Sequence, residues 1–194
     1  MKAFILRNKV CYHIIVIALV ILISFFLSIA NSYAALLGGH LINGPRNILY
    51  TVNGDAASYM GNINNAVYNW MYTGYDNPIY MYPVSSTDGS TVDFYTYYTT
   101  LNVVAVTTFW DANNMQQSYT VNYLWCKIHF NNKYKYDTSI NHDAVAAHEI
   151  GHALGLAHSN SNPYSIMCQI KHNRIVTKPQ YVDNEEVVSI YGRY

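Results

Sequence analysis

The chain is poor in charge of either sign. Its 194 residues include 11 Lys and Arg and 11 Asp and Glu, so the formal balance is zero. The first 34 residues hold three of the basic side chains and none of the acidic ones, which leaves eight basic against 11 acidic groups in the remainder. Recognition of a nucleic-acid backbone needs a basic surface, so this composition argues against nucleic acid as a partner.

Internal repeats and long linkers are also missing, so nothing in the sequence indicates a second folded unit. About 160 residues follow the N-terminal 34, which is the size of one domain with room for a hydrophobic core. We expect that domain over residues 47–194, after a short N-terminal segment at 35–46. We also expect the protein to be a monomer.

The first 34 residues have the layout of an export signal. Three basic side chains precede an uncharged apolar run from Ile14 to Ala30. Ser32-Tyr33-Ala34 then places small residues at the two positions that a signal peptidase reads. We expect residues 1–34 to be a signal peptide and the protein to be secreted. Because the run approaches the length of a short membrane span, about 17 residues, an uncleaved anchor that leaves the rest outside the cytoplasm is the alternative.

Cysteine is scarce, with three in the whole chain. Cys11 lies in the expected signal peptide, so export leaves Cys126 and Cys168. An even pair in an exported protein favours a disulfide. Two separate buried thiols are the alternative, because a bridge needs α-carbons within about 7 Å of each other and a sequence does not show that distance.

One segment concentrates side chains that bind metals: His148-Glu149-Ile150-Gly151-His152-Ala153-Leu154-Gly155-Leu156-Ala157-His158. The residues before it predict a helix from about residue 141 to about residue 154, capped by Ser139 or Asn141. On that helix His148 and His152 are four residues apart, so they project from one face about one turn from each other. Both rings can therefore reach one metal ion.

His158 is the third candidate ligand. On a continuous helix it would lie about 15 Å beyond His148, far outside the Zn–N distance of about 2.0 to 2.1 Å. The helix must therefore end and the chain must turn back. Gly155 is placed to allow this, since glycine accepts the left-handed conformation that ends helices.

These residue types predict a hydrolytic zinc site. Three neutral imidazoles, from His148, His152 and His158, leave the fourth tetrahedral position of one Zn²⁺ ion open for water. Glu149 is rotated about 100° around the helix from His148, so it is placed to accept a proton from that water as a general base. The alternatives are a helix with buried histidines and a chance glutamate, or a zinc site without catalysis.

This extended pattern is the signature of the metzincins, and the sequence most resembles their matrixin type, the matrix-metalloproteinase-like catalytic domain. Ser159 directly follows the third histidine, as is usual in that group. Met167 lies where the family places the methionine of its Met-turn; an ordinary core methionine is the alternative. The resemblance implies a zinc metalloendopeptidase that acts on protein or peptide substrates.

The resemblance also implies the fold class. This is an α/β (α+β) zincin-like domain with a twisted mixed β-sheet, an active-site helix, a Met-turn and a C-terminal helix. Residues 126–132 resemble the strand before the active-site helix. Residues 182–192 resemble the last helix, with Asp183 as N-cap and Gly192 as its stop.

The sequence departs from the family at two places. The segment between the leader and the first strand has no cysteine, so we do not expect the cysteine switch of latent family members. Gln169 stands where some other metzincins have a tyrosine ligand, so no such ligand is predicted. The loop Ser85 to Ser90, with Asp88 and Asp93, has oxygens that could hold Ca²⁺, but their irregular spacing does not predict a calcium site.

The upstream half predicts a strand at 47–52, a helix at 55–72 and three further strands near 79–84, 91–98 and 102–110. The helix has an apolar stripe that we assign to the core, formed by Met60, Ile63, Val67, Trp70 and Met71. Val103 to Phe109 is the candidate for the edge strand with which an extended substrate pairs in this family; an interior strand is the alternative. We expect the loop Gln169 to Lys178 to form the wall of the pocket beyond the scissile bond.

The 20 tyrosines leave a rival function open. Tyrosine is a good strand residue, but a tyrosine-rich chain is also compatible with an extracellular binding or adhesive surface. A non-catalytic zinc-stabilised binding domain is a second rival. Metal content and proteolysis with and without a chelator distinguish the three.

Overall fold

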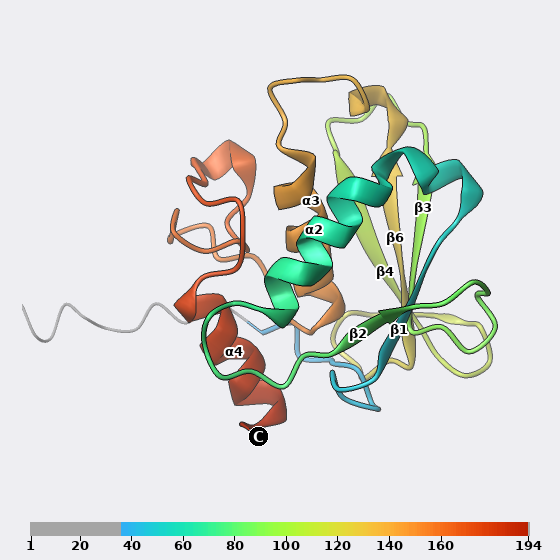
Figure 1. Ribbon diagram of the computed structural model, residues 1–194, viewed down its shortest axis with the longest axis vertical. Helices are drawn as coiled ribbons and strands as arrows, with labels where there is room; N and C mark the ends of the chain where they lie inside the picture. The colour runs from blue at the N-terminus through green and yellow to red at the C-terminus, as the bar shows by residue number, and fades with distance from the viewer. Residues whose placement is uncertain (1–35, 194) are drawn as a thin grey trace, which may run out of the picture. The chain divides into compact units, whose positions relative to one another are not determined.

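The computed structural model describes residues 36–193 (Figure 1). The expected signal peptide or anchor at 1–34 lies outside these residues. Within the described part of the chain, no helix combines the length and the apolar content that a membrane span requires.

A mixed β-sheet forms one layer of the described domain. Its strands lie side by side in the order β2-β1-β3-β6-β4-β5. Strands β2, β1, β3 and β6 are parallel, whereas β4 runs antiparallel to β6 and β5 antiparallel to β4. The strands are β1 (Ile48–Val52), β2 (Met81–Pro83), β3 (Val92–Tyr97), β4 (Ala105–Trp110), β5 (Gln116–Gln117) and β6 (Trp125–Asn131). The sequence-based expectation of a mixed sheet is confirmed.

Helices α2 (Met60–Met71) and α3 (His142–Ala153) pack together beside the sheet (Figure 1). The sheet has an apolar face that needs such a cover. On β6, for example, every second residue is apolar and fully buried: Cys126, Ile128 and Phe130. The indole of Trp70 is also buried and donates a hydrogen bond of 2.8 Å to the carbonyl of an α3 residue, Ala147. This contact fixes α2 against the helix that carries the zinc motif.

The predicted helix at 55–72 begins differently from the expectation. Its first part is a 3-10 helix, η1 (Gly54–Tyr59), and the α-helix starts only at Met60. Met60 is the first residue of α2 and lines a cavity at that end of the helix, so its side chain is 41% exposed. The assignment of Met60 to the core was therefore wrong, whereas Ile63, Val67 and Trp70 are buried as predicted.

The last helix, α4 (Tyr181–Tyr191), corrects a second detail. Gln180 is its N-cap, and Asp183 is the third helical residue in a capping box with Gln180. Asp183 is fully buried because its carboxylate accepts hydrogen bonds from inside the domain, from the backbone N–H groups of Ile166 and Gln180. Gly192 follows the helix with φ of +84°, as expected of a stop residue.

The two cysteines of the described domain are free thiols. Cys126 lies on the buried face of β6, whereas Cys168 lies beside the carbonyls of Gln169 and His172, to which its thiol donates. The disulfide that the even pair favoured is therefore not formed. The structure agrees with the alternative of two separate buried thiols.

Candidate metal centre

Helix α3 begins where its capping residue predicts. The side chain of Asn141 accepts a hydrogen bond of 2.9 Å from the backbone N–H of Ala144, which satisfies one of the free donors of the first turn. The helix then runs from His142 to Ala153, within the predicted bounds of 141 and 154. His148 and His152 are one turn apart on it.

The reversal after α3 is a Schellman motif centred on Gly155. The Gly155 N–H donates to the carbonyl of His152 at 2.9 Å, and the Leu156 N–H donates to the carbonyl of Gly151 at 3.0 Å. Gly155 has φ of +95°, which L side chains rarely adopt. A β-carbon there would also lie 3.2 Å from the carbonyl oxygen of Gly39. The expected role of Gly155 is confirmed.

The segment after Gly155 is held from the other side by the N-terminal segment. Leu36 forms a β-bridge with Leu156, and the Leu37 N–H donates to the Gly155 carbonyl at 3.0 Å. These contacts position the backbone only two residues before His158. Residues 36 and 37 thus belong to the structure that presents the third imidazole.

The three histidines of the motif come together. One ring nitrogen from each of His148, His152 and His158 lies within 4.8 Å of the others. The centroids of the His152 ring and the other two rings are both 4.8 Å apart, and those of His148 and His158 are 5.2 Å apart. A metal ion could therefore be held by these three side chains, and within residues 36–193 no other group of three or more such side chains lies as close together.

The hydrogen bonds of the rings suit a metal. Nδ1 of His148 lies 2.8 Å from the Ile166 carbonyl, and Nδ1 of His152 lies 2.7 Å from the Leu156 carbonyl. A carbonyl can only accept, so both Nδ1 atoms carry the proton and both Nε2 lone pairs are free to bind. The Nε2 atoms of His152 and His158 are 3.2 Å apart. Two nitrogens on a tetrahedral zinc ion are about 3.3 Å apart, so the donor set fits zinc.

The surroundings keep the imidazoles in the neutral form that a metal needs. Burial lowers the pKa of His148 well below its ordinary value and also lowers the pKa of His152. Loss of hydration, with the charges of His152, Lys171 and His172, lowers the pKa of His158 to about 4. At neutral pH all three rings can therefore offer a lone pair.

Glu149 is buried beside this group and contacts strand β4. Burial raises the pKa of Glu149 to about 7, while a hydrogen bond from Thr107 and the charge of Arg174 oppose the rise. The Thr107 hydroxyl lies 2.7 Å from Oε2 of the carboxylate. A carboxylate with a pKa near neutrality can both take up and release a proton, as a general base requires.

A buried turn supports the metal centre, as the Met-turn expectation requires. Met167 is fully buried in this turn, and a β-carbon placed on Gly151 of α3 would lie 2.3 Å from its sulfur. Only a glycine at 151 therefore allows the turn to pack this closely. The preceding residue, Ile166, provides the carbonyl that orients His148, and Asp183 holds the Ile166 N–H at 3.0 Å.

A cavity of about 500 Å³ lies beside the histidines. It is lined by α3, by the segment that leads into β4, and by residues of the loop 169–178, including Gln169 and Arg174. The loop therefore borders the site, as predicted. Phe109 and Trp110 of β4 pair with β5, but within the described chain Ala105 to Thr108 pair only with β6. The candidate edge strand is thus open along that part, whereas Phe109 is covered.

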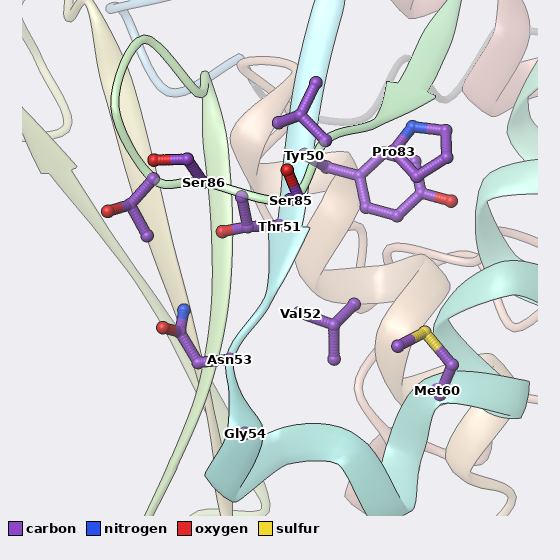
Figure 2. A pocket seen from close by; sticks show the side chains of 11 residues that line it. Tyr50, Thr51, Val52, Asn53, Gly54, Met60, Pro83, Ser85 and Ser86 are labelled. Atoms are coloured by element: carbon purple, nitrogen blue, oxygen red, sulfur yellow. The ribbon is translucent and has the colours of Figure 1, made fainter.

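A second cavity, of about 550 Å³, lies where β1 meets η1 and the loop after β2 (Figure 2). Its labelled side chains include Thr51, Val52, Met60 and Ser85, and no histidine, cysteine, acid or base lines it. It therefore lacks the groups that hydrolysis needs. Nearby, Asp93 is buried and accepts hydrogen bonds from Thr51 and Ser90.

Sequence reasoning missed four residues around the site. Gly151 carried a signal that could have been used, because glycine inside a helix usually has a packing reason. Asp183 was predicted to be the N-cap of the last helix, whereas it is the third helical residue and also binds the N–H of Ile166. Thr107 and Arg174 had no signal, because their contacts depend on how distant segments fold together.

Comparison with known proteins agrees with this arrangement. The family model described as matrixin, peptidase M10, matches residues 90–192, more than half of the chain. That range contains β3, β4, β6, α3, α4 and the three histidines. A search of curated proteins found no match. Together with the grouping of His148, His152 and His158, the matched range shows that the chain belongs to the matrixin family.

Proposed function

We propose that the protein is an exported zinc metalloendopeptidase that hydrolyses internal peptide bonds. Matrixins are zinc metalloproteases, so family membership supports a metalloprotease and zinc in general terms. The observation that carries the specific proposal is that three grouped histidines and a buried carboxylate line one cavity. In this proposal His148, His152 and His158 hold the ion.

The reaction needs a group that moves a proton. A bound zinc ion would act as a Lewis acid that lowers the pKa of water and polarises the scissile carbonyl. Glu149 takes the proton from the attacking water and delivers it to the leaving amine. Thr107 holds Oε2 of Glu149 at 2.7 Å, which leaves Oε1 to exchange the proton. Burial of this carboxylate raises its pKa to about 7, so near neutral pH it can both accept and release the proton.

The substrate backbone is held by the open part of β4 in this proposal. Residues 105–108 have one free side, and an extended peptide that adds to it gains main-chain hydrogen bonds without any need for a particular sequence. Val106 is 37% exposed there, and Val103 before the strand is 39% exposed. This arrangement favours an unfolded or flexible protein as substrate.

The replacement of Glu149 by Gln tests the assignment of the base. Glutamine has the same shape but cannot take up the proton, so we expect loss of turnover by about 10²-fold or more, with the zinc content unchanged. Casein digestion measures the turnover and metal analysis of the purified protein measures the zinc content. As a control, a chelator should abolish digestion by the unaltered protein. Full activity of Glu149→Gln would remove the assigned base, and proteolysis that survives removal of the metal would remove the metalloprotease.

Export is part of the same proposal. N-terminal sequencing of the protein recovered from the medium of an expressing cell would begin at residue 35 if the signal peptide is removed after Ala34. Recovery of the whole chain in the membrane fraction supports the anchored alternative, and recovery in the cytoplasm would contradict both.

A further inference from the structure

The cavity beside the histidines is lined by both aliphatic and cationic side chains. Val104, Ile140 and Val145 provide aliphatic wall, whereas Lys171 and Arg174 contribute two basic side chains from the loop after the Met-turn. Glu149 is the one acidic residue among those that line the cavity. The charges of Glu149 and Asp183 act on Arg174 through space, but neither carboxylate forms a salt bridge with it among the described residues.

Arg174 is the more constrained of the two cations. It is partly buried, and burial lowers the pKa of its guanidinium. Its Nη1 donates a hydrogen bond of 3.1 Å to the carbonyl of Ile166. In the described part of the chain, no carboxylate oxygen lies within the 4.0 Å of a salt bridge to Arg174. Asp183 is near, but its oxygens already accept hydrogen bonds from Ser165, Ile166 and Gln180.

Buried charge in proteins is normally paired, because removal of water from an ion has a large cost unless an opposite charge replaces it. A guanidinium has five N–H donors, and it binds a carboxylate with two of them in parallel. Arg174 therefore has donors to offer to a ligand, and the cavity that it lines opens onto the histidines. No carboxylate of the described residues contacts these donors directly, so a carboxylate of a substrate can accept from them.

We infer that this site selects peptide bonds next to an acidic residue, whose carboxylate pairs with the guanidinium of Arg174 inside the cavity. The methylene groups of a glutamate side chain pack against Val104, Ile140 and Val145, and Lys171 adds a second positive charge near the entrance. This inference rests on the proposed peptidase function and names its substrate class.

A peptide library with randomised positions on both sides of the cleaved bond tests the inference with the zinc-loaded, purified protein. We expect Glu and Asp to be enriched at one position beside the bond. For two peptides that differ only by Glu or Gln there, kcat/KM should differ by about tenfold or more, the effect of one charge-assisted hydrogen bond. Cleavage without an acidic preference would overturn the inference but not the proposed function.

Variants assign the preference to Arg174. In Arg174→Gln the ratio of kcat/KM for the Glu and Gln peptides should fall to about one, whatever happens to the absolute rate. Lys178→Gln is the matched control, because Lys178 is exposed in the same loop and does not line the cavity, so its ratio should stay unchanged. An unchanged ratio in Arg174→Gln would remove the assignment.

Binding separates failure of the inference from failure of the proposed function. The Glu149→Gln protein should bind the Glu peptide about tenfold more tightly than the Gln peptide, as measured by calorimetry. If the unaltered protein cleaves no peptide, the endopeptidase proposal fails. The ratio of the two binding affinities still shows whether the cavity prefers an acidic side chain. Equal affinity for the two peptides overturns the inference in either case.

Discussion

At the scale of single residues, the chemistry of Glu149 depends on a partner 42 positions earlier in the chain, Thr107. Burial alone would favour the protonated form of this carboxyl group, which could not act as the proposed base, since a low-dielectric environment raises the pKa of an acid. The hydroxyl of Thr107 and the charge of Arg174 act in the opposite direction. Thr107 also fixes the orientation of the carboxylate, because it contacts one oxygen and not the other.

The replacement of Thr107 by Val removes the hydroxyl and keeps the shape. We expect kcat to fall about tenfold, the effect of one hydrogen bond to a charged group, with KM and zinc content unchanged within about twofold. Thr107→Ser should recover most of the rate. Thr108→Val is the control, since Thr108 contacts Trp110 and the Lys127 carbonyl on the other face of β4. An unchanged kcat in Thr107→Val would show that the contact does not position the base.

Replacement by alanine is expected to have opposite effects on thermal stability at Gly151 and at Gly61. Alanine at 151 would place its β-carbon 2.3 Å from the sulfur of Met167, whereas a β-carbon at 61 meets nothing within 4 Å. We expect overpacking of about 1 to 3 kcal/mol at 151 to outweigh the helix propensity gained, so that Tm falls. Gly61→Ala should raise Tm by about 1 to 4 °C. Thermal unfolding of both variants measures the contrast, and a stabilised Gly151→Ala would contradict the close packing.

At the scale of elements, α4 is tied to the metal centre through the turn that contains Met167. Asp183 of α4 accepts hydrogen bonds from Ser165, Ile166 and Gln180, and the carbonyl of Ile166 in turn accepts from His148. The position of the His148 ring thus depends on a helix that begins more than 30 residues later. The sequence indicated α4 correctly but not this connection.

The substitution Asp183→Asn tests this connection. The amide nitrogen cannot accept, so a buried N–H donor loses its partner at a cost of about 1 to 3 kcal/mol. We also expect zinc affinity to fall about 10-fold to 100-fold, the usual effect of an altered partner of a metal ligand. Zinc titration and thermal unfolding measure the two effects. Glu185→Gln is the control in the same helix, because the Glu185 carboxylate accepts hydrogen bonds from the exposed Arg193. Equal zinc affinity of both variants would exclude the connection.

At the scale of the whole molecule, the sequence predicted features that depend on neighbouring residues, but not contacts between segments far apart in the chain. Asn141, the spacing of His148 and His152, and Gly155 act within a few residues, and their geometry follows from helix rules. The pairing of Thr107 with Glu149 needs the register between β4 and β6 and the packing of α3, which no short pattern encodes. The place of Arg174 depends on an irregular loop without periodicity.

Two errors have the same origin. The disulfide between Cys126 and Cys168 was inferred from their even number, although the bridge depends on a distance that only the fold sets. Met60 was placed in the core because of its helical spacing from Val67, but it is the first residue of the α-helix and its side chain lines a cavity there. In both cases the sequence pattern was real, and three-dimensional geometry overrode it.

Zinc-edge X-ray absorption of the purified protein tests most directly the claim that a chain reversal brings a distant imidazole to an ion already held by two others. We predict three imidazole nitrogens at about 2.0 to 2.1 Å from zinc in the unaltered protein, and two in His158→Ala. Two imidazoles in the unaltered protein, with no change in His158→Ala, would contradict the account.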